Sequence, residues 1–207
     1  MDIKALLNQL DLKSDIIVIA IIAVAIALIL TINRRRIVIA WREWRTQRCL
    51  DRIGGAQIRN LVCADGLDGF YTIDRLALTR DAILLITYKP YGGNIYCAER
   101  ISEWTQVIGQ KSFKFENPLF ELENQLTALR LLVGNAPLRG YLCFSNNALF
   151  PKGHPDSVLK PVTIPEALLT EGCESVKTEI QAAWDILVMH QKEASLSRHV
   201  SVKTWPC

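Results

Sequence analysis

Two neighbouring apolar segments decide the fold of this chain: FYTIDRLAL at residues 70–78 and AILLITY at residues 82–88. The first segment alternates apolar and polar residues well enough for a β-strand, and the second is an apolar run of strand length. The residues between them, Thr79-Arg80-Asp81, have the composition of a turn. The two segments therefore predict a hairpin of adjacent antiparallel strands.

After this hairpin the sequence predicts further strands and one short helix. Residues 94–97 follow a Pro-Tyr-Gly-Gly stretch and predict a third strand that completes a meander. Residues 121–132 carry leucines at helical spacing. Residues 139–144 form another apolar run of strand length. The chain beyond the hairpin therefore predicts the order strand, helix, strand.

The two ends of the soluble part predict helices. Residues 41–62 are mostly compatible with a helix, although Gly54-Gly55 interrupts them. From Pro165 to about Lys192 the pattern is that of a long amphipathic helix. The complete order of helix, three strands, helix, strand and helix predicts a mixed α/β (α+β) sheet with helices packed on it.

One long apolar run lies near the N-terminus. Residues 16–32 read IIVIAIIAVAIALILTI, without a charged residue, a glycine or a proline. At about 1.5 Å per residue this run spans ~26 Å, the short end of a bilayer crossing. The alternative, a cleaved secretory signal, needs a basic region before the apolar run and a small-residue cleavage site after it. Here the basic residues follow the run, so the sequence predicts an N-terminal transmembrane helix over residues 16–33.

The segment after the apolar run is strongly basic and contains Trp41 and Trp44. Because lysines and arginines are much sparser before the run, the positive-inside bias places the C-terminal domain in the cytoplasm, on the inner (plasma) membrane. Tryptophans suit headgroup depth, and the arginines predict contact with anionic membrane lipid. A basic linker without lipid specificity is the alternative. The arginines are Arg34, Arg35, Arg36, Arg42, Arg45 and Arg48.

The overall composition suits one reduced domain of ordinary charge. Of the 207 residues 50% are hydrophobic, and the formal net charge of +3 does not by itself indicate nucleic-acid binding. The six cysteines are scattered, with no CxxC pair and no histidine at ligand spacing, which argues against zinc. Reduced, buried thiols fit better than a disulfide framework. The cysteines are Cys49, Cys63, Cys97, Cys143, Cys173 and Cys207.

The hairpin also carries the residues with the most suggestive chemistry. Asp74 lies on its first strand, and Thr87-Tyr88-Lys89 ends its second. Two carboxylates on adjacent strands can hold one hard metal ion beside a phosphate, and a lysine can orient the nucleophile or stabilise developing charge. A structural salt bridge for Asp74 and a solvated strand end for Lys89 are the alternatives.

Five pieces of the chain, in order, carry a family resemblance. They are similar to the "Ile-Asp-His-hydrophobic" strand, the "Glu-x-Lys" strand, the "Gly-x-Ile-x … Trp" segment, the "Asn-Pro-hydrophobic" helix start and the late core strand of the nuclease-related domain (NERD) family. That family is a branch of the restriction-endonuclease-like fold, often found behind a transmembrane helix. The resemblance implies a restriction-endonuclease-like mixed sheet flanked by helices, with Mg²⁺-dependent phosphodiester hydrolysis as the family's chemistry. The pieces are residues 71–76, residues 83–89, residues 93–96 with Trp104, residues 115–119 and residues 141–144.

Several acids that the resemblance leads us to expect are replaced. Thr87 stands in place of the Glu before x-Lys, and Gln57 stands where the family often has a Glu in its first helix. Glu121 and Gln125 occupy the helix positions nearest to the family's Gln and His. A single carboxylate with a hydroxyl and an amide makes a poor Mg²⁺ site. The resemblance thus implies a vestigial site, with Asp74 as a weak metal ligand at most, made of Asp74, Lys89, Gln57 and Thr87.

These observations leave three functions open. The first is a degenerate nuclease that binds nucleic acid or a protein partner, cleaves nothing and needs no cofactor. The second is an active Mg²⁺-dependent nuclease with a rearranged site, and the third is a structural subunit of a membrane complex. The predicted organisation is a short N-terminal segment (1–15), a transmembrane helix (16–33), a basic juxtamembrane segment (34–48), a NERD-like domain (49–160), an amphipathic helix (161–193) and a flexible tail (194–207).

Overall fold

The first part of the chain is a single long helix. The structure, a computed structural model, describes residues 3–64, 69–169 and 176–201, and it divides into two compact units, residues 1–45 and residues 46–207. Helix α1 (Ile3–Leu50) makes up the first unit, and its last turn belongs to the second. The apolar run and the basic segment that follows it are therefore parts of one helix.

The described residues do not support the transmembrane prediction for residues 16–33. Among them, no helix combines the length and the apolar character that a membrane crossing requires. Part of the predicted segment lies outside the residues whose side chains are described, namely Ile16, Ile17, Ile19, Ala20 and Ile26.

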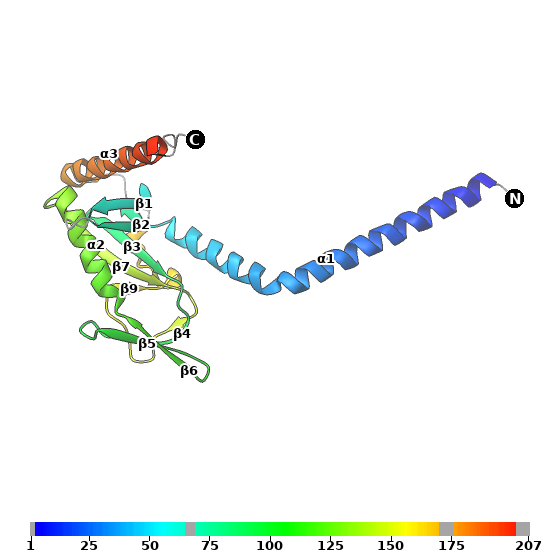
Figure 1. Ribbon diagram of the computed structural model, residues 1–207, viewed down its shortest axis with the longest axis horizontal. Coiled ribbons are helices and arrows are strands. Elements are labelled where there is room, and N and C mark those ends of the chain that lie inside the picture. The colour runs from blue at the N-terminus through cyan, green and yellow to red at the C-terminus, as the bar shows by residue number, and fades with distance from the viewer. Residues whose placement is uncertain (1–2, 65–68, 170–175, 202–207) are drawn as a thin grey trace. The chain divides into compact units, whose positions relative to one another are not determined.

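The second unit is built on a five-stranded mixed sheet, seen in Figure 1. β1, β2 and β3 are antiparallel neighbours, which confirms the predicted hairpin. β7 runs parallel to β3, and β9 runs parallel to β7. In spatial order the strands are β1 (Gln57–Ala64), β2 (Phe70–Leu78), β3 (Ile83–Lys89), β7 (Leu138–Phe144) and β9 (Val158–Leu159).

A second, four-stranded sheet is formed by three strands that follow β3 and by one short strand that follows β7. The prediction that residues 94–97 extend the first meander is wrong, because β4 pairs with β5 and β8 instead. Gly93 has a positive φ of 80°, and a Cβ there would lie 2.6 Å from the Val107 carbonyl oxygen. Only glycine accepts this turn and close approach, which take the chain out of the first sheet. The strands are β6 (Lys111–Glu116), β5 (Glu103–Ile108), β4 (Gly93–Tyr96) and β8 (Ala148–Leu149).

The region predicted as helix-compatible over residues 41–62 is part helix and part strand. α1 ends at Leu50, and β1 begins at Gln57 and pairs with β2 along its length. Gly54, at φ 64°, lies between them, where a Cβ would be 2.5 Å from the Leu78 carbonyl oxygen. The glycine pair that interrupts the pattern is therefore the place where the chain turns from helix to strand.

Helix α2 (Pro118–Val133) contains the predicted helix over residues 121–132. Its start follows from Asn117, whose side chain accepts a hydrogen bond from the Leu119 N–H at 3.0 Å, and from proline in the first turn. The Asn117 amide also donates to the carbonyls of Glu99 and Ile101, so it fixes the preceding loop as well.

The predicted C-terminal helix begins later than the sequence suggests. Two short 3₁₀ helices, η1 (Pro161–Thr163) and η2 (Glu166–Leu168), occupy the start of the predicted range, and α3 runs from Thr178 to Ser201. Proline lacks an N–H and disfavours a helical residue before it, so Pro161 and Pro165 limit this region to short turns. α3 also continues past the predicted end at residue 193 into the predicted tail, and residues 202–207 lie outside the described residues.

Both faces of the five-stranded sheet are covered. On one face Leu85 belongs to a core cluster with Leu129 of α2 and Trp184 of α3. On the other face Leu84 and Ile86 pack in a cluster with the end of α1 and with η2, through Leu50 and Leu168. A strand buried on both faces is apolar throughout, which explains the uninterrupted run of residues 82–86.

Candidate functional site

Asp74 lies where the regular alternation of β1 and β2 is interrupted. Ile58 and Leu61 contribute to the same core cluster although they are three residues apart, and so do Ile73 and Leu76 on β2. In an undisturbed strand such pairs would point to opposite faces. Asn60, between the β1 pair, has a positive φ of 53°, a conformation that asparagine tolerates better than most residues. This local distortion leaves Asp74 exposed in the middle of a strand.

The Asp74 carboxyl group lines a pocket of about 330 Å³ on the face of the sheet that meets the end of α1. Partial burial in this pocket raises the pKa of the Asp74 carboxyl group, and the negative charge of Glu121 acts in the same direction. A hydrogen bond from the Tyr88 backbone and the positive charges of Lys89 and Arg75 oppose that shift without cancelling it. The pocket is lined by Gln47, Leu50, Arg59, Asn60, Asp74, Arg75, Ile86 and Tyr88.

The residues that end β3 bind helix α2. The buried Thr87 hydroxyl donates to the Gln125 side-chain oxygen at 3.2 Å. The Gln125 amide donates to Glu121 at 3.3 Å, and the Lys89 ammonium donates to the same carboxylate at 2.7 Å. Lys89 is only 19% exposed, so it is not a freely solvated strand end. The Thr87 to Lys89 segment and one face of α2 thus form a single polar chain.

Asp74 and Lys89 lie on adjacent antiparallel strands, as the sequence predicts. Their side chains line different pockets, since Lys89 borders a second pocket of about 320 Å³ beside α2. They remain close enough for the charges of Lys89 and Glu121 to act on the pKa of Asp74. The structure therefore brings together Thr87, Lys89, Glu121 and Gln125, with Asp74 beside them on a different pocket.

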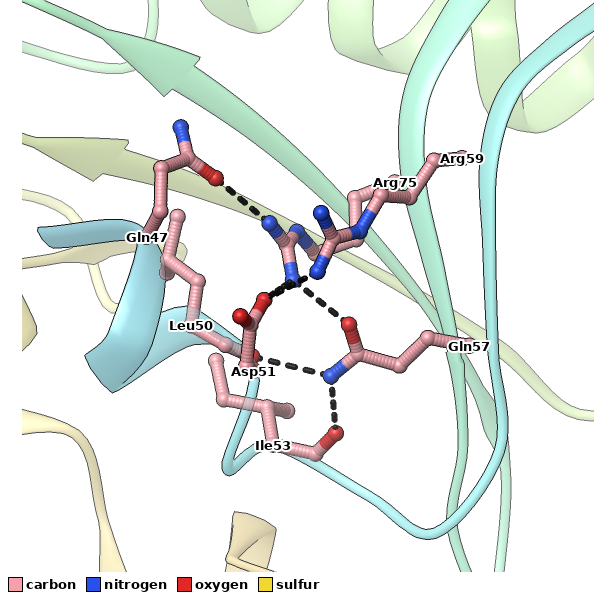
Figure 2. A network of polar contacts seen from close by, with 7 residues as sticks. All are labelled: Gln47, Leu50, Asp51, Ile53, Gln57, Arg59 and Arg75. Atoms are coloured by element: carbon pink, nitrogen blue, oxygen red, sulfur yellow. Dashed lines mark hydrogen bonds and ion pairs between the residues drawn. The ribbon is translucent and has the colours of Figure 1, made fainter. Parts of the chain in front are cut away.

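Gln57 belongs to a different cluster, centred on Arg75 and shown in Figure 2. Its amide nitrogen donates to the carbonyls of Leu50 and Ile53 at 2.9 and 2.7 Å, at the end of α1 and just after it. Its oxygen accepts a hydrogen bond from Arg75 at 2.5 Å. Gln57 therefore holds the end of α1 and is not directed at Thr87 or Lys89.

Arg75 is the buried member of this cluster, at 4% exposure. Besides Gln57 it donates to Asp51 and to Gln47, each at 2.5 Å. Asp51 also pairs with Arg59. Partial burial alone would raise the pKa of Asp51, but the hydrogen bond and charge of Arg75, together with Arg59, bring it below its ordinary value. No sequence motif indicates this network, because its members are spread from Gln47 to Arg75.

The donor set around Lys89 does not fit a divalent metal ion. Thr87 and Gln125 offer neutral oxygens that already bind each other, and Glu121 is engaged by Lys89. Mg²⁺ takes oxygen ligands with carboxylates among them, and it would have to displace an ammonium group here. Within the described ranges, no three histidine, cysteine, aspartate or glutamate side chains are grouped as metal ligands.

The described cysteines do not form part of either pocket. Cys49, Cys63, Cys97 and Cys143 are free thiols, and Cys63 and Cys143 are buried. Burial raises the pKa of Cys63 and of Cys97 to about 11 and the pKa of Cys143 to about 12. The thiols of Cys63, Cys97 and Cys143 are therefore protonated and weakly nucleophilic at neutral pH. Cys173 and Cys207 lie outside the described residues.

Fold and site together define a mixed α/β domain with an acid on one central strand and a lysine at the end of the next. The model of the nuclease-related domain family matches residues 40–145, just over half of the sequence, and the chain belongs to this family.

One relative adds a second comparison. The chain is 29% identical over 80 residues to an uncharacterised protein of Bacillus anthracis, a match that covers 39% of this chain and 36% of that protein. The match therefore spans little more than a third of the relative's length. No solved structure matches the chain.

Proposed function

We propose that this restriction-endonuclease-like domain is a degenerate nuclease that binds nucleic acid and does not cleave it. The observation that carries the proposal is the state of the lysine motif. Its acid position is Thr87, whose hydroxyl binds Gln125, and its lysine is paired with Glu121 at 2.7 Å. In this arrangement the motif holds α2 against the sheet and offers no second carboxylate beside Asp74.

Electrostatics argues against metal-dependent hydrolysis at this site. A divalent cation exchanges much of its hydration for the ligands of its site, so a single carboxylate supports only weak binding. The raised pKa of Asp74 weakens this further, because protons compete for the carboxylate at a higher pH than for an ordinary aspartate. Without a bound metal ion, the family's route to an activated water is missing.

One observation favours an active enzyme as the second candidate. Glu121 is a carboxylate on α2 that acts on Asp74 through its charge, alongside Lys89. If Lys89 moved away from Glu121, the two acids could share one Mg²⁺ ion and polarise a phosphate. This rearranged site would take its second acid from α2 in place of the strand position of Thr87, and it would still lack the acid that Gln57 replaces.

A comparison of metal binding and cleavage distinguishes the two candidates. Calorimetry with Mg²⁺ and Mn²⁺ on the full-length protein should show weak or no binding to the wild type and tighter binding to Thr87→Glu, which adds a carboxylate beside Lys89. Thr105→Glu on β5 is the matched control, because it adds the same charge to a strand away from Asp74. Wild-type cleavage of DNA or RNA that disappears in Asp74→Ala would overturn the degenerate reading.

We also infer that residues 16–33 anchor the domain in the inner membrane, with the domain in the cytoplasm. The support comes from the charge-free apolar sequence, from the arginines that follow it, and from the described apolar side chains of α1, which are exposed. Examples are Ile21, Leu28 and Ile32, which are 63%, 59% and 73% exposed. Apolar groups in such numbers need a covering, and lipid chains would supply it.

Cell fractionation tests this anchor. The full-length protein should stay with membranes after alkaline extraction, and a reporter fused after Cys207 should be active on the cytoplasmic side. Release by alkali would exclude an integral anchor, and periplasmic reporter activity would exclude the orientation. Neither result bears on nucleic-acid binding, so the two proposals can fail separately.

A further inference from the structure

The pocket beside Lys89 is lined by four aromatic side chains, three of which also pack against the core of the sheet. Two of the rings, Tyr91 and Phe115, contact each other with centroids 4.7 Å apart. Phe120, in the first turn of α2, is 40% exposed, so its ring is accessible to a ligand. The aromatic residues of this pocket are Tyr71, Tyr91, Phe115 and Phe120.

The charges in this pocket restrict the kind of ligand it can take. Lys89 lies in the wall with Glu116 and Glu121, and the lysine neutralises Glu121 at 2.7 Å. With Lys89 and Glu121 paired, the wall keeps the negative charge of Glu116, which would repel an incoming phosphate. A neutral group avoids this repulsion. The polar groups then serve as hydrogen-bond partners, with Glu116 as an acceptor and the Asn124 amide, also in the wall, as donor and acceptor.

We propose that this pocket binds one unpaired nucleobase. A base is neutral and planar, it stacks on aromatic side chains, and its edge carries N–H donors that suit a carboxylate. The volume of about 320 Å³ is at the lower end of the range for small-molecule sites, which suits a single ring system. A base within a duplex is stacked and paired on all sides, so the pocket selects single strands or extruded bases.

This inference deepens the proposed function and rests on it for the strand that carries the base. The phosphates of that strand would lie outside the pocket, away from Glu116 and Glu121. The aromatic pocket would then contribute a preference for base-bearing strands, separate from any attraction of the protein for phosphate.

The experiment separates the base from the backbone. Full-length protein is titrated, by fluorescence anisotropy, with an oligodeoxycytidine and with an abasic strand of the same length, and free cytidine is titrated by calorimetry. Stacking of one base predicts about 5- to 140-fold tighter binding of the base-bearing strand. Phe120→Ala should abolish most of this preference. Phe113→Ala is the matched control, because Phe113 is 48% exposed on β6 and does not line the pocket.

Each outcome decides one point. Equal affinity for both strands, or equal effects of Phe120→Ala and Phe113→Ala, would overturn the base pocket and leave the proposed function standing. Binding of cytidine that depends on Phe120, without binding of either strand, would keep the pocket and overturn the proposed function. Binding of tetramethylammonium in place of cytidine, with the same dependence on Phe120, would show a cation site and overturn the pocket as proposed.

Discussion

Replacing Arg75 by methionine tests whether the buried cluster of Figure 2 holds the end of α1 on the sheet. The substitution keeps an unbranched side chain at a position that is 4% exposed, and it removes three hydrogen bonds, to Asp51, Gln57 and Gln47. Arg59→Met is the matched control. Its guanidinium pairs with the same carboxylate of Asp51, but its side chain is 53% exposed.

The structure sets the expected magnitude. A hydrogen bond to a charged group contributes about 1.5–3 kcal/mol, and a buried polar atom left without a partner costs about 1–3 kcal/mol. Asp51 and Gln47 are exposed and can bind water in the variant, so most of the loss falls on the half-buried Gln57. We therefore expect Arg75→Met to lower the free energy of unfolding by about 2–4 kcal/mol. The exposed Arg59 pair should contribute about 1 kcal/mol or less.

Urea unfolding of the full-length protein, followed by far-UV circular dichroism, measures both values at neutral pH. For a domain of this size the Arg75 loss corresponds to a fall in Tm of roughly 5–15 °C. The m-value should stay constant, since neither variant changes the surface exposed on unfolding. Equal destabilisation by the two variants would refute the argument, because burial would then not distinguish the two arginines.

Three further predictions follow from individual contacts. In the folded protein the pKa of Asp51 lies below its ordinary value of 3.8, so the stability that the Asp51 carboxylate contributes is present above pH 3.8 and is lost as the pH falls through the folded pKa. The difference in the free energy of unfolding between wild type and Arg75→Met, measured with urea, should therefore be constant from about pH 5 to 8 and shrink below about pH 4. Burial raises the pKa of Cys63 to about 11 and that of Cys143 to about 12. At pH 8 both thiols should therefore react with a small thiol reagent at least about 100-fold more slowly in the native protein than after denaturation, as measured by mass spectrometry. Fast labelling of Cys143 in the native protein would contradict this. Asn117→Ala should lower the free energy of unfolding by about 2–4 kcal/mol, more than the loss of a helix cap alone, since the Asn117 amide also donates to two loop carbonyls. Asn117→Asp keeps the oxygen that caps the helix and should destabilise the protein less. Equal destabilisation by the two variants would show that the cap contributes nothing.

Local pattern was enough to predict the central hairpin and the helix after Asn117. Residues 70–78 and 83–89 form the paired strands β2 and β3 because the alternation, the short turn and the apolar run all favour the same structure. The start of α2 has a cap residue and a proline at their preferred positions. Each of these elements is specified by residues close together in the chain.

Pairing between distant segments was not predictable in this way. Residues 57–64 are compatible with a helix, and only the partner strand β2 makes them β1. Residues 94–97 are of strand type, but the sequence does not say which sheet they join, and β7 takes the place beside β3. In both cases tertiary contacts override a weak local preference.

The candidate site was likewise only partly predictable from the sequence. The strand positions of Asp74 and Lys89 follow from the hairpin, whereas the partner of Lys89 depends on how α2 lies over the sheet. Gly140 allows that close approach, since a Cβ there would lie 2.9 Å from the Leu126 side chain. The role of Gln57 was missed for a comparable reason, because its partners Leu50 and Ile53 lie at the end of α1 and just after it, in a region where the sequence pattern continues the helix.

The parallel pairing of β3 with β7 has a consequence for synthesis of the chain. β3 acquires one neighbour, β2, from the adjacent hairpin, but its other neighbour ends at Phe144, about 55 residues after Lys89. At ~5–20 residues per second, a ribosome needs roughly 3–11 s to make the missing strand. During that interval an apolar strand edge is open to other nascent chains. Truncated products that stop before Leu138 keep this edge open permanently and should aggregate, so any shortened version of the protein for biophysical work must extend beyond Phe144.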